Sequence, residues 1–309
     1  NPTVTVNIVD ANLNDGDTTS VVTFTFSEAP TGFTAADITA VGGTVSGLAV
    51  KAGSNGLVYE ATFTANDGFS GAGSVSVGTG WTDAAGNTGV GGSDTVAIDT
   101  SNPTVTVDIV DGSLNDGDTS SLVTFSFSEA PTGFTADDVT VEGGTLTGLA
   151  VKAGTDGKVF EATFTASQDF SGTGRVTVGT GWTNAAGNTG VGGADTVAVD
   201  TRNPTVVVDI ADATLNDGDP ASVVTFTFSE VPTDFTAADI TAVGGTVSGL
   251  AVKAGSNGLV YEATFTANDG FSGSGSVSVG TGWTDAAGNT GVGGSDTVAI
   301  DTSNPTVTV

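Results

Sequence analysis

Along most of the chain, apolar residues alternate with Thr, Ser and acidic residues with a period of two. Near the N-terminus, Val4, Val6 and Ile8 are separated by Thr5 and Asn7. Because successive side chains of a β-strand point to opposite faces, this alternation predicts antiparallel strands with one buried face. The many Val, Ile, Phe and Thr residues in these segments also favour strands. We therefore expect an all-β protein.

The first hundred residues divide into seven such segments, which are separated by turns rich in Gly, Asn and Asp. Asn14-Asp-Gly16 is one of these turns, and its residue types favour tight reversals of the chain. Thr34 and Asp37 have the spacing of a capping box, which predicts one helical turn. About seven short strands in this length are typical of an immunoglobulin-like (Ig-like) β-sandwich. The predicted strands are 3–9, 20–27, 38–42, 44–51, 57–65, 73–79 and 94–99.

This pattern recurs with a fixed period of 101 residues. Trp81, which we expect to anchor a core, is repeated as Trp182 and Trp283. Each copy is near the size of a single domain, and the period is longer than that of solenoid repeats or propeller blades. We expect three tandem Ig-like domains in an elongated array and interpret the chain as an excerpt from a longer one. The predicted domains are 1–101, 102–202 and 203–303, with 304–309 as the start of a fourth repeat.

The segments that connect the domains are very short. They read Asp99-Thr-Ser-Asn-Pro103 and Asp200-Thr-Arg-Asn-Pro204. Proline fixes its own φ and favours an extended conformation of the residue before it. Neighbouring domains should therefore nearly touch, and the loops at their facing ends should share a junction.

The composition narrows the possible functions. The 35 acidic residues face only six basic ones, for a formal net charge of −29. Such a surface repels nucleic acids and anionic membranes and attracts hard cations. The sequence has no Cys, and it has no His, the commonest general base. With no run of about 18 apolar residues and no acid pair in a predicted cleft, we expect neither membrane insertion nor enzymatic activity.

If the strands alternate in direction, the acidic residues concentrate at the two ends of each domain. The C-terminal acids of one domain then meet the N-terminal acids of the next. The first junction is predicted to gather Asp15, Asp17, Asp99, Asn102, Glu129, Asn184 and Asn188. The second junction is predicted to gather Asp116, Asp118, Asp200, Asn203, Glu230, Asp285 and Asn289.

So many carboxylates cannot share a small space without compensation, and six basic residues are too few to neutralise them. Ca²⁺ binds six to eight oxygens from carboxylates, amides and backbone carbonyls in a flexible geometry. We therefore predict Ca²⁺ at the junctions, with a merely solvated acidic surface as the alternative. The corresponding residues at the free ends complete the predicted ligand set: Glu28, Asp83, Asn87, Asp217, Asp219 and Asp301.

Two segments in each copy resemble the Ig-like tandem repeats of giant bacterial surface adhesins of the RTX type and the biofilm-associated, Bap-like type. They are Phe26-Ser-Glu-Ala-Pro-Thr-Gly-Phe33 and Asp83-Ala-Ala-Gly-Asn87. The resemblance implies type I secretion, extracellular display on Gram-negative bacteria, and an extension region stiffened by Ca²⁺ at its junctions. It also implies that Glu28, Asp83, Asn87 and their counterparts lie near the cation sites. The second copy departs from the motif at Asn184, where the other copies have Asp.

On this basis we predict a structural extender that projects an adhesive domain from the cell surface, with calcium ions and neighbouring repeats as its partners. The alternative is a module that itself binds a carbohydrate or a cell, for which Phe33, Phe69 and their copies are the loop aromatic candidates. Ice binding through rows of Thr is a further alternative, although the sequence has no flat, short-period Thr array.

Overall fold

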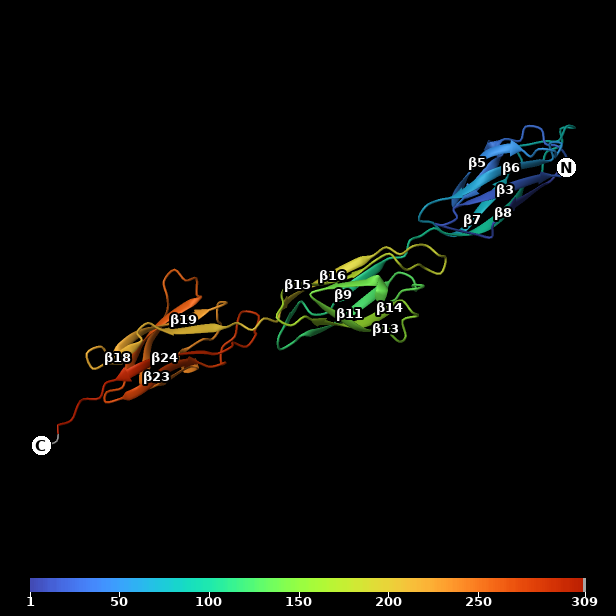
Figure 1. Ribbon diagram of the computed structural model, residues 1–309. Helices are drawn as coiled ribbons and strands as arrows, with labels where there is room; N and C mark the ends of the chain where they lie inside the picture. The colour runs from blue at the N-terminus through green and yellow to red at the C-terminus, as the bar shows by residue number, and fades with distance from the viewer. Residues whose placement is uncertain (308–309) are drawn as a thin grey trace.

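The computed structural model describes residues 1–307, which form 24 β-strands and three short 3-10 helices. The strands build three domains that follow one another along an elongated molecule (Figure 1). The predicted fold class, three tandem Ig-like sandwiches with almost no helix, is confirmed. Of the predicted fourth repeat, residues 304–307 form neither strand nor helix, and residues 308–309 lie outside the described part.

The same eight strands and one 3-10 helix occur in each domain. The first domain contains β1 (Val4–Ile8), β2 (Asn12–Asn14), β3 (Thr19–Phe26), η1 (Ala35–Asp37), β4 (Ile38–Val41), β5 (Gly43–Val50), β6 (Val58–Ala65), β7 (Ser70–Val77) and β8 (Gly92–Asp99). The second contains β9 (Val105–Ile109), β10 (Ser113–Asn115), β11 (Ser120–Phe127), η2 (Ala136–Asp138), β12 (Val139–Glu142), β13 (Gly144–Val151), β14 (Val159–Ala166), β15 (Ser171–Val178) and β16 (Gly193–Asp200). The third contains β17 (Val206–Ile210), β18 (Thr214–Asn216), β19 (Ala221–Phe228), η3 (Ala237–Asp239), β20 (Ile240–Val243), β21 (Gly245–Val252), β22 (Val260–Ala267), β23 (Ser272–Val279) and β24 (Gly294–Asp301).

Each domain is a sandwich of two four-stranded sheets. In the first domain the strand orders are β1-β3-β6-β5 and β2-β8-β7-β4, and the other two domains repeat them. Neighbouring strands are antiparallel except β2 and β8, which run parallel with Leu13 opposite Ile98. The strand β2 was not among the seven predicted strands. Its three residues place only Leu13, which is 2% exposed, in the core, and one apolar residue shows no periodicity.

The alternating apolar residues form one core per domain, as predicted. In β3 the buried residues include Phe24 and Phe26, and the intervening residues are exposed or half-buried. Trp81 is 1% exposed and packs edge-on against Phe26, with ring centroids 4.8 Å apart. Phe33 also lies in this aromatic group, 4.9 Å from Phe26 and 5.2 Å from Tyr59. Edge-to-face pairs of this kind add about 0.5–1.5 kcal/mol each beyond the area that they bury.

The predicted capping box is present in all three copies. In η1, the Thr34 hydroxyl accepts a hydrogen bond from the Ala36 N–H, and the Asp37 carboxylate accepts one from the Thr34 N–H. The box closes the loop between β3 and β4. It therefore fixes one of the turns at the N-terminal end of the domain.

Strand pairing sets which loops lie at which end of a domain. Because β2 runs parallel to β8 with Asn14 opposite Asp99, the turn after β2 and the end of β8 lie together at the C-terminal end. Figure 1 shows this end of the first domain facing the second domain across a short connection, and the same arrangement follows between the second and third. No helix among the described residues is long and apolar enough to cross a membrane.

Candidate functional site at the domain junctions

The N-terminal end of each domain presents a tight turn built around a single Asp or Asn. In the first domain, Asp83 Oδ1 accepts hydrogen bonds from the backbone N–H groups of Ala85 and Asn87, at 2.9 and 2.8 Å. Asp83 Oδ2 accepts a third bond from the Asn87 side-chain amide at 2.7 Å. The Asn87 side-chain bond has the largest effect on the pKa of Asp83. Together with the backbone bonds it lowers this pKa, because all of them stabilise the charged form of the carboxyl group. The side chain therefore holds the turn together from within.

The second and third domains have the same turn at their N-terminal ends. Asn184 Oδ1 accepts from the N–H groups of Ala186 and Asn188 at 3.0 and 2.9 Å. Asp285 Oδ1 accepts from Ala287 and Asn289 at 2.8 and 2.9 Å. In each case one oxygen is committed to the backbone of the turn, and the second polar atom of the side chain is directed to other partners.

In both junctions the turn after the short strand β2 or β10 docks onto this turn of the next domain. At the first junction, the Asn14 side-chain N–H donates to the Ala186 carbonyl at 2.7 Å. The Asp15 backbone N–H donates to Asn188 Oδ1 at 2.9 Å. The second junction repeats both bonds, from Asn115 to Ala287 at 2.7 Å and from Asp116 to Asn289 at 2.7 Å. The two domain pairs are thus joined through the same four positions.

Docking buries the asparagine that receives the preceding domain. Asn188 and Asn289 are both 0% exposed. Asn87 occupies the same position at the free N-terminal end of the first domain and is exposed. Each connecting segment adds one further bond, from the Asn102 and Asn203 side-chain N–H groups to the carbonyls of Thr189 and Thr290, both at 3.0 Å.

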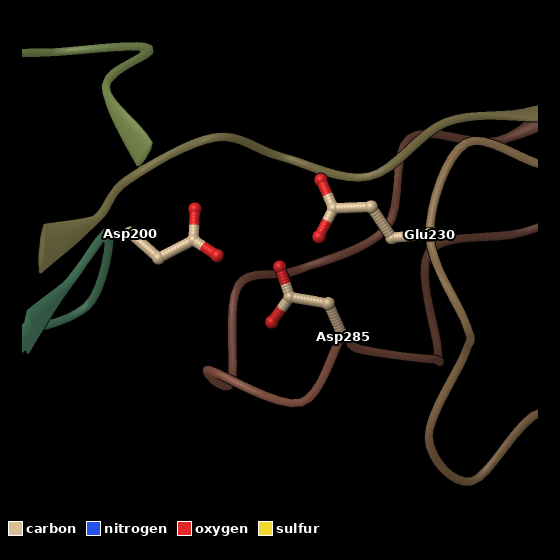
Figure 2. A group of neighbouring side chains, drawn as sticks. All are labelled: Asp200, Glu230 and Asp285. Carbon is tan, nitrogen blue, oxygen red and sulfur yellow. The ribbon is translucent and has the colours of Figure 1, made fainter. Parts of the chain in front are cut away.

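The second junction brings three carboxylates together. Asp200, Glu230 and Asp285 each place one oxygen within 4.8 Å of the others, and Asp285 is buried. Figure 2 shows the three side chains converging from the end of β16, from the loop after β19 and from the turn before β24. Burial, followed by the charges of Asp200 and Asp285, raises the pKa of Glu230, while Arg202 opposes the shift. The three groups therefore repel one another in the absence of a cation.

The first junction differs at one of these three positions, where Asn184 replaces the carboxylate. Its side-chain N–H group donates to Asp99 Oδ2 at 3.3 Å and to Glu129 Oε2 at 3.2 Å. The Asn188 side-chain N–H group donates to the carbonyls of Asp99 and Ser101 at 2.8 and 3.2 Å. The first junction is therefore held by N–H donors that the second junction lacks among its described residues.

The three carboxylates of the second junction fit a hard cation by their chemistry and spacing. Asp200, Glu230 and Asp285 offer only oxygen, the donor atom that Ca²⁺ prefers. Two oxygens on opposite sides of one Ca²⁺ are at most about 5 Å apart, since each Ca–O distance is about 2.3–2.6 Å. The spread of 4.8 Å lies within that limit. These three residues could share one ion.

The other predicted site residues lie where the strand directions put them. Asp17 and Asp118 close the turns of Asn14 and Asn115, and their backbone N–H groups bond to those asparagines. At the free C-terminal end of the third domain, Asp217 and Asp219 lie in the turn after β18. Asp301 ends β24, and the Ser303 side chain and backbone lower its pKa by hydrogen bonding to the charged form. At the free N-terminal end of the first domain, Glu28 follows β3.

Asn14 and Asn115 are docking residues that were not among the predicted site residues. Both stand first in an Asn-Asp-Gly-Asp turn, and Asn216 keeps the same place in the third copy. The side-chain oxygen of Asn14 accepts from the N–H groups of Gly16 and Asp17, which turns its amide N–H group outward. The recurrence of an Asn ahead of an acidic turn was the available signal.

Comparison with known proteins places the sequence in one family. Residues 1–98, 99–199 and 200–307 each match the family model described as "Bacterial Ig-like domain". No curated protein sequence matches the chain.

Several solved structures are similar to the chain. Invasin, described as a bacterial integrin-binding protein, is 16% identical over 98% of this chain and 60% of its own, with a TM-score of 0.36. The Yersinia pseudotuberculosis adhesin InvE is 17% identical over 64% and 58%, with a TM-score of 0.25. The D00-D0 domain of intimin is 15% identical over 63% and 98%, with a TM-score of 0.31. The chain thus spans less than two thirds of the invasin and InvE chains.

Proposed function

Because this chain belongs to the bacterial Ig-like domain family, we propose that it is a structural extender segment of a bacterial surface adhesin. Its domains hold a separate adhesive domain away from the cell and act outside the cell. Tandem Ig-like domains are typical of adhesion and structural proteins that have no enzymatic activity. The motif resemblance supports the narrower assignment to the RTX-type, Bap-like adhesins of biofilms, which are secreted by a type I route.

The repeated docking of neighbouring domains carries this proposal. The same two loops meet in both junctions, through the same pair of direct hydrogen bonds. A net contribution of about 1 kcal/mol for each hydrogen bond is typical, so the bonds favour one relative orientation of the domains. A module that only binds a ligand has no need for a fixed orientation, whereas an extender requires it to keep its length.

We propose further that Ca²⁺ strengthens the docking. Asp200, Glu230 and Asp285 would hold the ion, which would cancel the repulsion that otherwise separates the third domain from the second. Extracellular modules bind Ca²⁺ with dissociation constants of about 10⁻⁴–10⁻³ M. At a hundredfold excess over the dissociation constant, one site stabilises the state that binds the ion by about 2.7 kcal/mol. That is less than three times the typical contribution of about 1 kcal/mol from one hydrogen bond.

The alternative, a repeat that itself binds a carbohydrate or a cell, loses its aromatic candidates. Phe33 is 8% exposed and belongs to the aromatic core, as do its copies Phe134 and Phe235. Phe69 is half-buried and packs against the same core. Phe33 is therefore closed to a sugar, Phe69 is only partly accessible, and no other observation favours this alternative.

Small-angle X-ray scattering of the three-domain chain tests the proposal. In millimolar Ca²⁺ we expect the profile of a stiff rod, and in excess EDTA a shorter or more flexible particle. A control in NaCl at matched ionic strength separates a bound ion from general screening of the charge. An identical profile with and without Ca²⁺ would contradict cation-dependent stiffening, and a flexible profile in both would contradict the extender.

A further inference from the structure

The two junctions of this chain have the same docking bonds but differ in the group at one buried position. Asn184 fills it in the first junction and Asp285 in the second, and both are at most 3% exposed. In both, one oxygen is bonded to two backbone N–H groups of the turn. The difference therefore lies entirely in the second polar atom, which is an N–H donor in Asn184 and an oxygen acceptor in Asp285.

The Asn184 amide has one orientation in this turn. Rotating it by half a turn would aim its N–H group at two N–H donors and its oxygen at two carboxylates. Its N–H group therefore faces Asp99 and Glu129, to which it donates at 3.3 and 3.2 Å. To offer a cation its oxygen instead, the side chain would have to release both backbone bonds of the turn.

The same substitution redirects a second amide. Where the position holds an Asp, the neighbouring asparagine donates to that carboxylate within its own domain, from Asn87 to Asp83 at 2.7 Å and from Asn289 to Asp285 at 2.9 Å. Where it holds Asn184, Asn188 cannot donate to it. The Asn188 N–H group instead crosses the junction to the carbonyls of Asp99 and Ser101. With Asn at position 184, two side-chain amides, those of Asn184 and Asn188, therefore donate across the first junction.

From these contacts we infer that the residue at position 184 or 285 sets whether a junction needs a cation. In the first junction, the Asn184 amide N–H group takes the place of the ion as the partner of the carboxylates, so this junction docks without Ca²⁺. The second junction, which has Asp285 at this position, docks fully only when Ca²⁺ is bound. This inference rests on the proposed Ca²⁺-dependent stiffening and specifies where along the chain it acts. This chain therefore has one junction that docks with or without Ca²⁺ and one whose docking depends on Ca²⁺.

Arg202 is the competing source of positive charge at the second junction. It stands where the first junction has Ser101 and where the third copy has Ser303. Arg202 is exposed, and the salt bridges among the described residues are three Lys–Glu pairs that do not include it. The Arg202 backbone N–H donates to Asp200 Oδ1 at 3.4 Å. Its guanidinium makes no ion pair with the three carboxylates among the described residues and offsets part of their repulsion from a distance.

The test measures each junction separately by pulsed electron spin resonance. The chain has no Cys, so single cysteines at the exposed, equivalent positions Thr62, Thr163 and Thr264 can carry spin labels in pairs across either junction. In the wild-type sequence, we expect the distance distribution across the first junction to be equally narrow in Ca²⁺ and in EDTA. The distribution across the second should broaden in EDTA.

Exchanging the two residues should exchange the behaviour. N184D should make the first junction sensitive to EDTA and raise its apparent affinity for Ca²⁺ at least about tenfold, because affinity follows the number of charged ligands. D285N should make the second junction insensitive. N7D and D108N change the charge by the same amounts on exposed strand positions, each to the residue of another copy, and should change neither junction. Unchanged near-ultraviolet circular dichroism will verify that each variant is folded.

The outcomes separate the inference from the function on which it rests. If both wild-type junctions broaden equally in EDTA, or if N184D and D285N leave the responses where they were, the inference is wrong while Ca²⁺-dependent stiffening stands. If no junction responds to Ca²⁺ in any variant, the proposed cation dependence fails as well. R202S should increase the EDTA response of the second junction. If R202S abolished the Ca²⁺ response, the position of the arginine rather than residue 285 would control the junction.

Discussion

Asn188 makes the largest number of interdomain bonds of any side chain in the structure, and replacing it with Ala provides the sharpest test of the docking geometry. Its oxygen accepts from the Asp15 N–H, and its amide donates to the carbonyls of Asp99 and Ser101. The side chain is fully buried between the two domains. The substitution N188A removes all three bonds and leaves their partners unpaired.

The magnitude follows from the count of bonds. Each intramolecular hydrogen bond contributes about 0.5–1.5 kcal/mol net, and water that enters the loosened junction replaces part of the loss. We expect the docked state to lose about 1–3 kcal/mol, which changes its ratio to the undocked state by about 5- to 150-fold. N289A removes one interdomain bond, which Asp116 donates, together with the bond to Asp285 within its own domain. Because only the first of these crosses the junction, docking should lose about 1 kcal/mol.

The assay measures spin-label distances across each junction in Ca²⁺. The fraction of the distance distribution in its narrow component gives the fraction of docked molecules, and hence the ratio of docked to undocked states. N87A is the matched control, because Asn87 occupies the same position in the first domain and its side chain donates to Asp83 of its own domain. N87A should leave both junctions unchanged. A first-junction distribution as narrow in N188A as in N87A would refute the reasoning that these hydrogen bonds fix the orientation.

Two further predictions concern the core and pH. In G190A the added Cβ would overlap the indole of the buried Trp182. We expect a loss of about 1–3 kcal/mol from overpacking, seen as a lower midpoint of thermal unfolding of the second domain. The control G112A places Ala in open space and should be neutral. Without divalent ions, docking at the second junction should weaken with rising pH, since the docked state raises the pKa of Glu230. Protonated Glu230 stabilises the docked state fully below about pH 4.5, the ordinary pKa of its carboxyl group. This stabilisation is lost as the pH rises through the raised pKa of Glu230 in the docked state. Spin-label distances that do not change over this pH range would contradict the assignment.

The sequence predicted the sandwich well because the alternation is nearly continuous. Phe24 and Phe26 in β3 follow strict period two, and side-chain burial follows it residue by residue. The strand β2 was missed because its register depends on a parallel pairing with β8, 85 residues away along the chain at Leu13 and Ile98. Local patterns contain no information on such a pairing. The place of Phe33 was missed for a similar reason, because a loop residue can reach the core only if the loop folds back.

For the site, the sequence predicted which residues lie at the same end of a domain, but not how their side chains are oriented. Strand direction alone brought Asp200, Glu230 and Asp285 to one junction, and the structure places them together. The direction of the strands could not predict that the Asn184 side-chain N–H group faces two carboxylates. The orientation of this amide depends on its oxygen being hydrogen-bonded to the backbone of the turn. Asn184 was therefore predicted as an oxygen ligand, whereas in the structure the polar atom that it directs at Asp99 and Glu129 is an N–H donor.

This difference bears on how a repeated chain can vary its mechanics. Nearly identical domains usually imply nearly identical junctions, yet the amide and carboxylate at positions 184 and 285 differ by one polar atom and change three interdomain bonds. The turn tolerates both because its backbone N–H groups bond only to the oxygen that Asn and Asp have in common. A substitution there leaves the fold of the domain unchanged and alters only its attachment to the preceding one. The stiffness of each junction can therefore change independently of domain stability, through a single residue in each copy.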